Sequence, residues 1–419
     1  MRKRILLLGG HMALLRKAID CGLEVVNVQK PVACSPAMAG IGAELHVLDY
    51  QDVPAVLALA ERLQCDRVFD RIMSQTEAAQ LVTGYLTTRF GLPGNGYSVT
   101  RVMHDKRLLR ALLNERGLGP VAVGAGSCHE DLADFVARHG AAVAKPPMAS
   151  GSLGVRKVRS VAEVDAAWEW LAAMEVGEFM LEELLVGTEV SVETMSAEGR
   201  HAVVAITGKY TGDGVVELAH VVPAPIAGAD AHSAACLTVR MLDAAGMVEG
   251  PAHTEIILTA DGPRVVETHS RRGGDRIADL VDLVYGVDLE RLAFQVVVEP
   301  VLVEPLPPAR GAAAIHFLTA EPGRVTAIAG LADARAVPGV IEARVRADVG
   351  DVVGPLLWSE ERCGYVIARA ADAVGAFAAA RTAAAKVTIR TEPAPCTAPA
   401  TMGSMLAKAG EVLDPFAIG

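Results

Sequence analysis

The most constraining feature of the chain is a pair of apolar segments, residues 254–258 and 264–267, joined by the turn sequence Ala260-Asp-Gly-Pro263. A turn of this composition between two β-rich runs predicts a β-hairpin. Each segment carries one acid, Glu255 and Glu267, and a hairpin of this length can direct both carboxylates toward one point. Hard carboxylate oxygens suit Mg²⁺, which proteins usually hold with one or two acids plus substrate phosphates. The alternative interpretation is a pair of solvated surface charges.

The residues that follow the second acid supply complementary charge. His269, Arg271 and Arg272 come directly after Glu267, and the pair Gly273-Gly274 follows them. Guanidinium groups suit the charge of a phosphoryl or acyl-phosphate group. A Gly-Gly step lets a substrate approach backbone N–H groups closely. The combination favours a metal–phosphate–carboxylate site over two isolated surface acids.

Length, composition and charge limit the class of protein. A chain of 419 residues is too long for one hydrophobic core and predicts two or three domains. Abundant Ala, Val, Leu and Gly with an aromatic content of 4% are typical of an α/β protein. The net charge of −11 argues against nucleic-acid binding, which needs a basic face. Seven scattered cysteines without a CxxC pair indicate reduced thiols and no zinc site.

The chain shows neither a signal peptide nor a membrane segment in its sequence. The apolar run of the first residues is too short and is followed by charged residues. No apolar stretch reaches the roughly 18 residues of a membrane helix. We therefore expect a cytoplasmic protein that does not bind membranes.

The N-terminal region alternates between expected strands and helices. A strand over 4–8, the turn Gly9-Gly10, a helix over 11–21 and a strand over 24–28 are followed by a strand over 44–48, a helix over 53–63 and a strand over 67–69. Such alternation predicts a parallel, Rossmann-like sheet. No GxGxxG completes the glycine pair and no Walker A sequence occurs, so we interpret Gly9-Gly10 as a tight strand–helix turn.

Two lysines and a loop of small residues indicate a phosphate site. Lys106 lies on an amphipathic helix expected over 99–116, and Lys145 ends a strand expected over 141–144. The loop 149–155 follows shortly, and its backbone N–H groups can form a concave nest for an anion. Because Lys145 adds the point charge that a phosphate needs, phosphate binding is favoured over a plain mobile hairpin.

The order of these motifs resembles the ATP-grasp carboxylate–amine ligases. The parts are Asp105-Lys106, Lys145-Pro146, the loop 150–155, Glu182-Glu183-Leu184 with Gly187-x-Glu189, Gly250-x-x-His253-x-Glu255, and Glu267-x-His269-x-Arg271-x-Gly273-Gly274. Each part is weak alone, and their order and spacing over residues 100–280 carry the resemblance. The segments 311–318 and 321–323 are similar to the extra lobe of the L-amino-acid (dipeptide) ligase branch.

The resemblance implies an α/β ATP-grasp fold with an N-terminal Rossmann-like parallel-sheet subdomain, a mobile α+β lid and a C-terminal α+β lobe. The expected domains are 1–95 (the N-terminal βαβ domain), 96–205 (the central helix and lid), 206–300 (the catalytic subdomain) and 301–419 (the C-terminal lobe). It also implies ATP and Mg²⁺, with Mn²⁺ as a substitute, as cofactors. A homodimer is the default expectation for an enzyme of this size.

By position, the resemblance assigns a ligand to each motif. The ATP phosphates fall to Lys106, Lys145, Lys209 and the flap residues Ser150, Gly151, Ser152 and Gly154. The adenine falls to Glu182 with the backbone of Glu183 and Leu184, and the ribose hydroxyls to Glu189, whose carboxylate can accept from both. Glu255 and Glu267 would bind Mg²⁺, and Arg271 would stabilise the acylphosphate and the tetrahedral intermediate.

The substrate candidates are the residues after the second metal acid, namely Arg271, Arg272, Gly273, Gly274 and Asp275. Asp275 would contact substrate or lie in the first turn of a helix. One position departs from the family, which usually has Asn where this chain has His269. Imidazole suits Mn²⁺ better than Mg²⁺. His269 is therefore open to three interpretations: a metal ligand, a substrate contact or a packing residue.

The implied reaction joins a carboxylate, expected to be that of an amino acid, to an amine. ATP would phosphorylate the carboxylate, and the amine would displace phosphate from the acylphosphate, giving an amide or peptide bond. One alternative is a carboxylase of the biotin-carboxylase or purine-pathway type that uses bicarbonate. A second alternative is a non-catalytic ATP-binding regulatory protein. The loss of Lys145, Glu255 or Glu267 would favour that second alternative, and all three are present.

Overall fold

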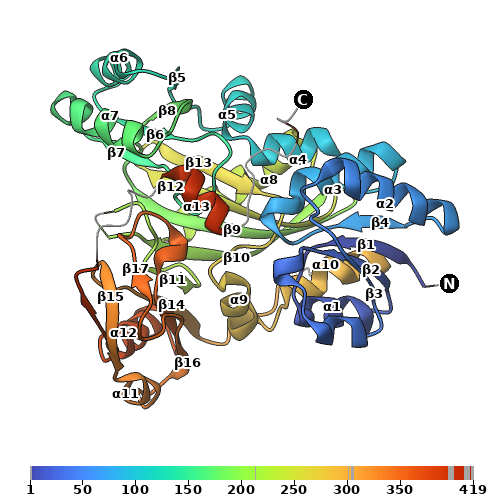
Figure 1. The fold of residues 1–419 in the computed structure, drawn as a ribbon. Coiled ribbons are helices and arrows are strands. Elements are labelled where there is room, and N and C mark those ends of the chain that lie inside the picture. The colour runs from blue at the N-terminus through green and yellow to red at the C-terminus, as the bar shows by residue number, and fades with distance from the viewer. Residues whose placement is uncertain are drawn as a thin grey trace.

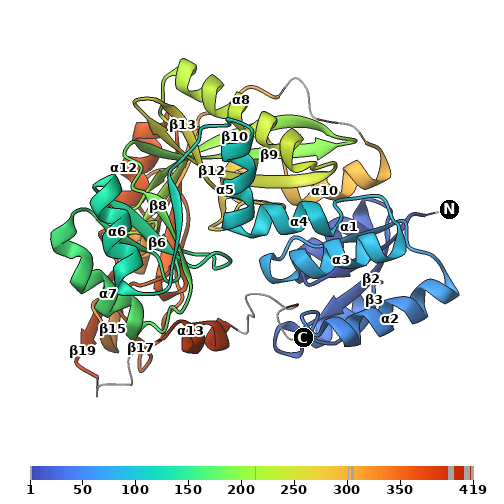
Figure 2. The same ribbon diagram turned by 90° about the horizontal axis from the view of Figure 1, so that it is seen from above.

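The computed structural model describes residues 2–212, 214–300, 302, 306–394, 401–409 and 416, and Figure 1 shows their arrangement. Four sheets organise the chain, and they divide it into an N-terminal domain, a lid, a large central sheet and a C-terminal lobe. In Figure 2 the lid lies to the left and the N-terminal domain to the right, with the strands of the central sheet between and above them. The expected fold class, an α/β ATP-grasp architecture that begins with a parallel sheet, is confirmed.

The N-terminal domain is a four-stranded parallel sheet in the order β3-β2-β1-β4. Its strands are β1 (Arg4–Leu8), β2 (Glu24–Gln29), β3 (Glu44–Val47) and β4 (Arg71–Met73), and its helices are α1 (Met12–Asp20), α2 (Val53–Asp66) and α3 (Gln80–Phe90), with short 3₁₀ turns at η1 (Pro31–Ala33), η2 (Pro36–Gly40) and η3 (Glu77–Ala79). The prediction of a strand over residues 67–69 is wrong. Helix α2 continues to Asp66, and the strand that pairs with β1 starts at Arg71.

A helical connection, α4 (Tyr97–His104) and α5 (Lys106–Glu115), leads from this domain to the lid. The single helix expected over 99–116 is broken at Asp105, whose backbone is extended at φ −87° and ψ 110°. The Asp105 carboxylate accepts from the Arg107 N–H and so caps α5. The Lys106 N–H donates to the Pro147 carbonyl at 2.9 Å instead of continuing the helix. This break directs Lys106 inward.

The lid is an antiparallel sheet in the order β5-β8-β6-β7. Its strands are β5 (Val123–Gly126), β6 (Ala142–Lys145), β7 (Arg156–Val158) and β8 (Phe179–Glu183), and α6 (His129–His139), η4 (Val161–Glu163) and α7 (Val164–Ala173) cover its outer side. Leu132, Phe135, Leu171 and Phe179 are buried in a hydrophobic core that also includes Trp358 and Met405 of the C-terminal lobe. The lid therefore packs against that lobe through a shared core.

The central sheet has eight strands in the order β13-β12-β9-β10-β11-β14-β18-β16, and each pair of neighbouring strands is antiparallel. The strands that carry the site are β9 (Thr188–Ala197), β10 (Arg200–Tyr210), β11 (Ala219–Val222), β12 (Gly250–Thr259) and β13 (Gly262–His269), and the helices between and after them are α8 (Gly228–Ala245), α9 (Ile277–Tyr285) and α10 (Leu289–Val298). Residue 205, where a domain boundary was expected, lies inside β10, so the sheets divide the chain elsewhere.

The C-terminal lobe completes this sheet and adds a smaller one. Strands β14 (Ala312–Leu318), β16 (Val340–Val345) and β18 (Gly364–Ala370) extend the central sheet, whereas β15 (Gly323–Ala329), β17 (Val352–Val353) and β19 (Thr388–Glu392) form a three-stranded sheet, with α11 (Leu331–Arg335), η5 (Ser359–Glu361), α12 (Ala373–Ala384) and α13 (Met402–Ala409) completing the lobe. Cys396 lies outside the described residues. Among the helices that the structure describes, none is long and apolar enough to cross a membrane.

The two faces of strands β9, β12 and β13 have opposite characters, because successive side chains of a strand alternate between faces. Glu255 and Glu267 are Cα partners across the predicted hairpin, so both acids lie on one face. The other face carries Val190, Ile256 and Val265, which pack against α8. The sequence pattern of alternating acids and aliphatic residues therefore separates a polar site from a hydrophobic core.

We expect Ile256→Ala to lower the free energy of unfolding by about 2–5 kcal/mol, because a fully buried aliphatic side chain is replaced by a cavity. Urea unfolding of purified protein gives this quantity. Ile341→Ala is the matched control, since Ile341 is 54% exposed, and it should change stability by no more than about 0.5 kcal/mol. Equal losses for the two variants would contradict the assignment of Ile256 to the core.

Candidate active site

A cavity of about 790 Å³ lies between the lid, the polar face of the central sheet and the C-terminal lobe. The lid contributes Lys145, the loop 150–152 and the strand end 182–184, and the C-terminal lobe contributes Ser359 and Glu360. Most of the residues predicted to form the site line this one cavity: Lys106, Lys145, Ser150, Gly151, Ser152, Glu182, Glu183, Leu184, Glu189, Lys209, Glu255, Glu267, His269, Arg271, Gly274 and Asp275. Gly154, Arg272 and Gly273 do not line it.

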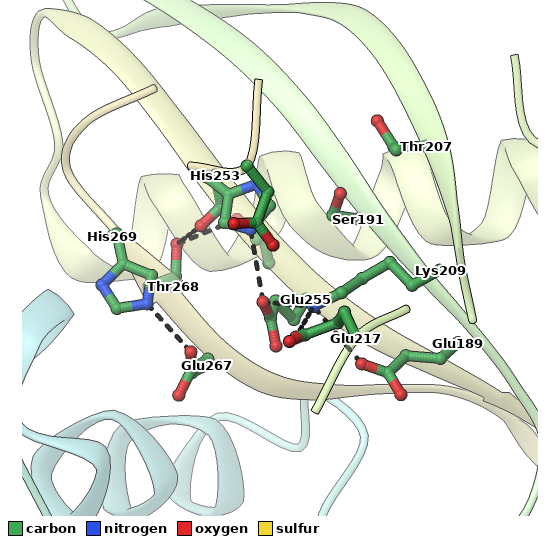
Figure 3. A network of polar contacts seen from close by, with 12 residues as sticks. Glu189, Ser191, Thr207, Lys209, Glu217, His253, Glu255, Glu267, Thr268 and His269 are labelled. Carbon is green, nitrogen blue, oxygen red and sulfur yellow. Dashed lines mark hydrogen bonds and ion pairs between the residues drawn. The ribbon is translucent and has the colours of Figure 1, made fainter. Parts of the chain in front are cut away.

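The two facing acids of the hairpin are each paired with a lysine. Lys209 from β10 contacts Glu255, and Lys106 contacts Glu267 at 2.8 Å, as Figure 3 shows for the first pair. Burial would raise the pKa of Glu255, but Lys209 and His253 together outweigh it and lower the value to about 2. The same competition between burial and Lys106 lowers the pKa of Glu267. Both acids are therefore carboxylates at neutral pH.

Lys209 lies among three carboxylates. Its ammonium group is 3.3 Å from Glu189 and 3.1 Å from Glu217, in addition to the contact with Glu255 (Figure 3). One oxygen atom from each of these acids lies within 4.8 Å of the others. Burial, and the other carboxylates after it, raise the pKa of Glu189 even though Lys209 opposes the shift. Glu217 precedes β11 and was missed by the sequence analysis, because it belongs to none of the quoted motifs.

Lys145 is held by a buried acid of the neighbouring strand. Glu182 bonds Lys145 at 2.6 Å through one oxygen and Arg110 at 2.6 Å through the other. All three side chains are buried. Glu182 thereby fixes Lys145 in the cavity wall, and Glu183 and Leu184 line the cavity beside it. A carboxylate has about four acceptor positions, so these two ion pairs leave room for the expected contact with an adenine amino group, which stays a prediction.

The flap over the cavity is in contact with both neighbouring units. The Ser152 hydroxyl donates to the Val215 carbonyl at 2.9 Å, and the Gly151 carbonyl accepts from the Ser359 N–H at 3.1 Å. Gly151, Ser152 and Gly154 all have positive φ, which Gly adopts without strain and Ser does not. At Gly154 an added Cβ would lie 2.7 Å from the Pro146 ring. The loop is thus held closed by bonds at its tip and by glycines at its bends.

An acid of the N-terminal domain reaches the other end of the hairpin. Glu77 bonds His104 and His269 at 3.0 Å each and forms an ion pair with Arg271. Burial would raise the pKa of Glu77, but Arg271 and His269 lower it well below its usual range. Glu77 precedes the quoted motifs by many residues, and nothing in its local sequence marks it.

Both ring nitrogens of His269 are occupied by carboxylates. Nδ1 contacts Glu77 and Nε2 contacts Glu267, each at 3.0 Å (Figure 3 shows the second contact). Burial opposes the charged ring, but these acids outweigh it and raise the pKa of His269. With both ring nitrogens bonded to carboxylates, the geometry favours a packing and charge-balancing role for His269, and metal ligation by this residue stays a prediction.

A second buried histidine, His253, contacts Glu255. His253 contacts Glu193 through Nδ1 at 2.9 Å and Glu255 through Nε2 at 3.3 Å. Glu193 also accepts from the Ser191 hydroxyl at 2.7 Å and is fully buried. Burial opposes the charge of His253, but Glu193 outweighs it and raises the pKa of His253 to about 9.

The segment 272–275, which follows the hairpin, contacts α10 and the C-terminal lobe. Glu290 at the start of α10 pairs with Arg272 at 2.7 Å, and the same carboxylate pairs with Lys17 and His11 of the N-terminal domain. An added Cβ at Gly273 would lie 3.0 Å from Glu193 and His253, so the glycine is needed for close packing. Asp275 is turned toward the C-terminal lobe, where it pairs with Arg362.

The donor set of the cavity fits a magnesium–nucleotide complex. It contains two facing ionised carboxylates, three lysines from three different elements, and a glycine-rich loop with positive φ. Carboxylates are the protein ligands that Mg²⁺ prefers, and lysines bind phosphate as point charges. A volume of about 790 Å³ lies within the range for cavities that bury a drug-sized ligand.

Comparisons with known proteins agree with this geometry. The family model for the ATP-grasp domain matches residues 140–279, and the model for the L-amino acid ligase C-terminal domain 2 matches residues 316–392. The chain is 24% identical over 299 residues to the L-arginine-specific L-amino acid ligase of Bacillus subtilis, a match that covers 68% of this chain and 71% of the relative.

Solved structures share the fold over nearly the whole chain. The L-amino acid ligase of Bacillus licheniformis superimposes with a TM-score of 0.79 at 20% identity, covering 93% of this chain and 99% of the other. The carboxyaminoimidazole ribonucleotide synthase of Aspergillus clavatus, complexed with ATP, gives a TM-score of 0.70 at 15% identity, covering 91% of this chain and 97% of the other.

The fold, the facing acids and the matched domain together define an ATP-grasp ligase, an enzyme that forms C–N bonds between a carboxylate and an amine at the expense of ATP. The match to the C-terminal domain adds that, among the branches of this class, the chain is similar to the L-amino acid ligases.

We expect the contribution of Glu290 to stability to depend on pH. Burial would raise its pKa, but bonds from His11, Arg272 and Lys17 lower it from 4.5 to about 2. A lowered folded-state pKa means that the stabilisation is present above 4.5 and disappears as the pH falls toward 2. Glu290→Gln should therefore cost about 1–3 kcal/mol near pH 6, allowing for solvent screening, and progressively less toward pH 3.

Urea unfolding of both proteins across this pH range measures the difference. Glu321→Gln, which replaces an exposed acid, is the control and should show a small difference at every pH. A Glu290→Gln deficit that stays constant from pH 6 to pH 3 would contradict the ionic origin of the effect.

Proposed function

We propose that the protein joins the carboxylate of one amino acid to an amine, through an acylphosphate formed with ATP. The observation that supports this proposal best is the convergence of Glu255 and Glu267 with Lys106, Lys145 and Lys209 on one cavity that also receives Arg271. Metal-binding acids and phosphate-binding lysines at one point are what phosphoryl transfer to a carboxylate requires. The similarity to L-amino acid ligases favours amino acids over bicarbonate.

The charges of the site suggest how the ligands enter it. Glu255 and Glu267 would hold Mg²⁺, while Lys106, Lys145 and Lys209 would hold the phosphates, together with the flap residues Ser150, Gly151 and Ser152. In the present structure Lys106 and Lys209 are instead paired with those same acids. An exchange of partners, acids to metal and lysines to phosphate, leaves every buried charge paired, whereas binding of either ligand alone would not. Metal and nucleotide should therefore bind cooperatively.

The chain's own residues would then promote two successive steps. When bound, Mg²⁺ neutralises and aligns the triphosphate. Arg271, 14% exposed, is the cationic side chain at the end of the hairpin that can stabilise the charge of the acylphosphate and of the tetrahedral intermediate. The flap, with its tip bonded to Val215 and Ser359, would exclude water from the acylphosphate. Glu189 lines the same cavity, and its carboxylate would accept from the ribose hydroxyls.

Three further expectations rest on general grounds. The cysteines that the structure describes are unpaired, in keeping with the cytoplasmic location inferred from sequence. Mn²⁺ should replace Mg²⁺, because both accept carboxylate ligands. A homodimer remains the default assembly, which sedimentation would test.

The first test is phosphate release from ATP and Mg²⁺ across pools of amino acids, followed by mass spectrometry of the products. We expect ADP, phosphate and a product lighter by one water than the sum of two amino acids. Turnover with bicarbonate and none with amino acids would instead favour a carboxylase. ATP binding without any turnover would favour a regulatory protein.

Glu255→Gln and Glu267→Gln should each reduce turnover by about 10²-fold or more, because a buried metal ligand is lost. Calorimetric titration with ADP, with and without Mg²⁺, should show metal-dependent affinity in the natural protein and little metal dependence in either variant. Asp261→Asn, at the exposed tip of the same hairpin, is the matched control and should behave as the natural protein. Metal-independent binding by the natural protein would contradict the proposed site.

A further inference from the structure

Asp275 is an acid of the cavity to which the proposed reaction gives no role. Its side chain is 24% exposed, and it lines the cavity beside Gly274. Its backbone has φ 53°, and the next residue, Arg276, has φ 63°. Two consecutive non-glycine residues in the left-handed region are unfavourable unless the surroundings impose the conformation.

The C-terminal lobe imposes that conformation through side-chain contacts. Arg362 donates to both oxygens of Asp275, to Oδ2 at 2.8 Å and to Oδ1. Arg276 is held in turn by Glu342 at 3.1 Å and by the Tyr365 hydroxyl. All three partners lie within the residues matched to the L-amino acid ligase C-terminal domain. The lobe therefore determines how the segment after Arg271 presents Asp275 to the cavity.

Arg362 is itself fixed on every side. It is 3% exposed, its guanidinium carbon lies 3.7 Å from the centre of the Phe317 ring, and its remaining N–H groups donate to the carbonyls of Ser359 at 2.7 Å and Glu217 at 3.2 Å. A planar fork bound bidentately to a carboxylate sets the plane of that carboxylate. Arg362 thus positions Asp275 without reaching the cavity itself.

A third contact leaves one acceptor position of Asp275 open. His220 of β11, which is buried, contacts Oδ2 through Nε2 at 3.0 Å. Arg362 and His220 together occupy three of the roughly four lone-pair positions of a carboxylate. The open position belongs to Oδ1, and the exposure of Asp275 to the cavity makes it available to a ligand.

The chemistry of Asp275 decides which ligand this position suits. Burial would raise the pKa of Asp275, but the bonds from His220 and Arg362 lower it far below its usual range. An ionised carboxylate only accepts hydrogen bonds, and its negative charge beside an amine favours the ammonium form of that amine. An ammonium nitrogen has no lone pair and cannot attack an acylphosphate. Asp275 is therefore suited to bind an amino group that has to stay protonated and unreactive during the reaction.

We propose that Asp275 binds the α-ammonium group of the amino acid whose carboxylate is activated, and that Arg362 is the positioning residue that holds Asp275 for this task. The inference rests on the proposed ligase function and assigns to that function a donor of stated chemistry, a carboxylate with a protonated amino group beside it. It also gives the reaction a direction, because the donor's own nitrogen is kept from acting as the nucleophile.

Hydroxylamine is the probe that separates donor from acceptor. It replaces the amine acceptor, traps the acylphosphate as a hydroxamate and is uncharged at neutral pH. The experiment measures hydroxamate formation by the full-length protein with a panel of L-amino acids, each compared with the carboxylic acid that lacks only the amino group. We expect the natural protein to prefer the amino acids.

The preference should depend on Asp275 and Arg362. Asp275→Asn should raise the KM for the amino-acid donor by about 10-fold to 100-fold, since a hydrogen bond between charges is lost, and leave the KM for the desamino acid unchanged. Arg362→Met should have the same selective effect, and Arg362→Lys should restore part of the preference. Arg369→Met, on β18 and outside the cavity lining, is the matched control.

Each other outcome has a separate meaning. If Asp275→Asn leaves hydroxamate formation intact and raises only the KM of an amine acceptor, the group held by Asp275 is the acceptor's and the proposal is overturned. Equal losses with amino acids and desamino acids, in a variant with unchanged unfolding free energy, would also overturn it. No hydroxamate from any carboxylate with the natural protein would refute the proposed ligase function itself.

Discussion

The site depends on the pairing of charges on one buried face of the central sheet. Glu255 and Glu267 face one another across the hairpin, and Lys209 and Lys106 neutralise them. Removing one partner of such a pair leaves an unpaired buried charge, which costs several kcal/mol. The same lysines and acids are the groups that phosphate and Mg²⁺ would bind. The structure thus holds the site together, before ligands bind, with the charges that the ligands later engage.

The segment 267–276 is fixed from two directions by residues far away in sequence. Glu77 of the N-terminal domain pairs with Arg271 and His269, and Arg362 of the C-terminal lobe pairs with Asp275. Glu290 adds a bond to Arg272 and ties it to α1. Each outer unit therefore contributes a charged side chain to the same short stretch. This arrangement gives a physical reason for the outer domains, because each of them orients the short stretch that follows Glu267.

Local patterns were sufficient for the hairpin, the lysines and the flap, because turn composition and strand alternation act over a few residues. Local patterns were insufficient for residues whose role depends on a partner far away in the sequence. Glu193 sits in a strand that reads as half-exposed, yet His253 and Ser191 bury it. Glu182 matches an adenine motif, and nothing in that motif indicates its ion pairs with Arg110 and Lys145. The expected long helix is broken at Asp105 because the Lys106 N–H bonds Pro147 of the lid instead.

The sequence by itself determined the α/β class, the ATP-grasp resemblance and the facing acids, since composition, order of motifs and strand periodicity are properties of the chain alone. The tertiary structure decided which charged side chains form ion pairs and with which partners. Glu77, Glu217, His220 and Arg362 carry no local signal, and they acquire their roles from burial beside partners brought together from separate domains. Pairing of buried charges is a property of three-dimensional distance, which a linear pattern does not encode.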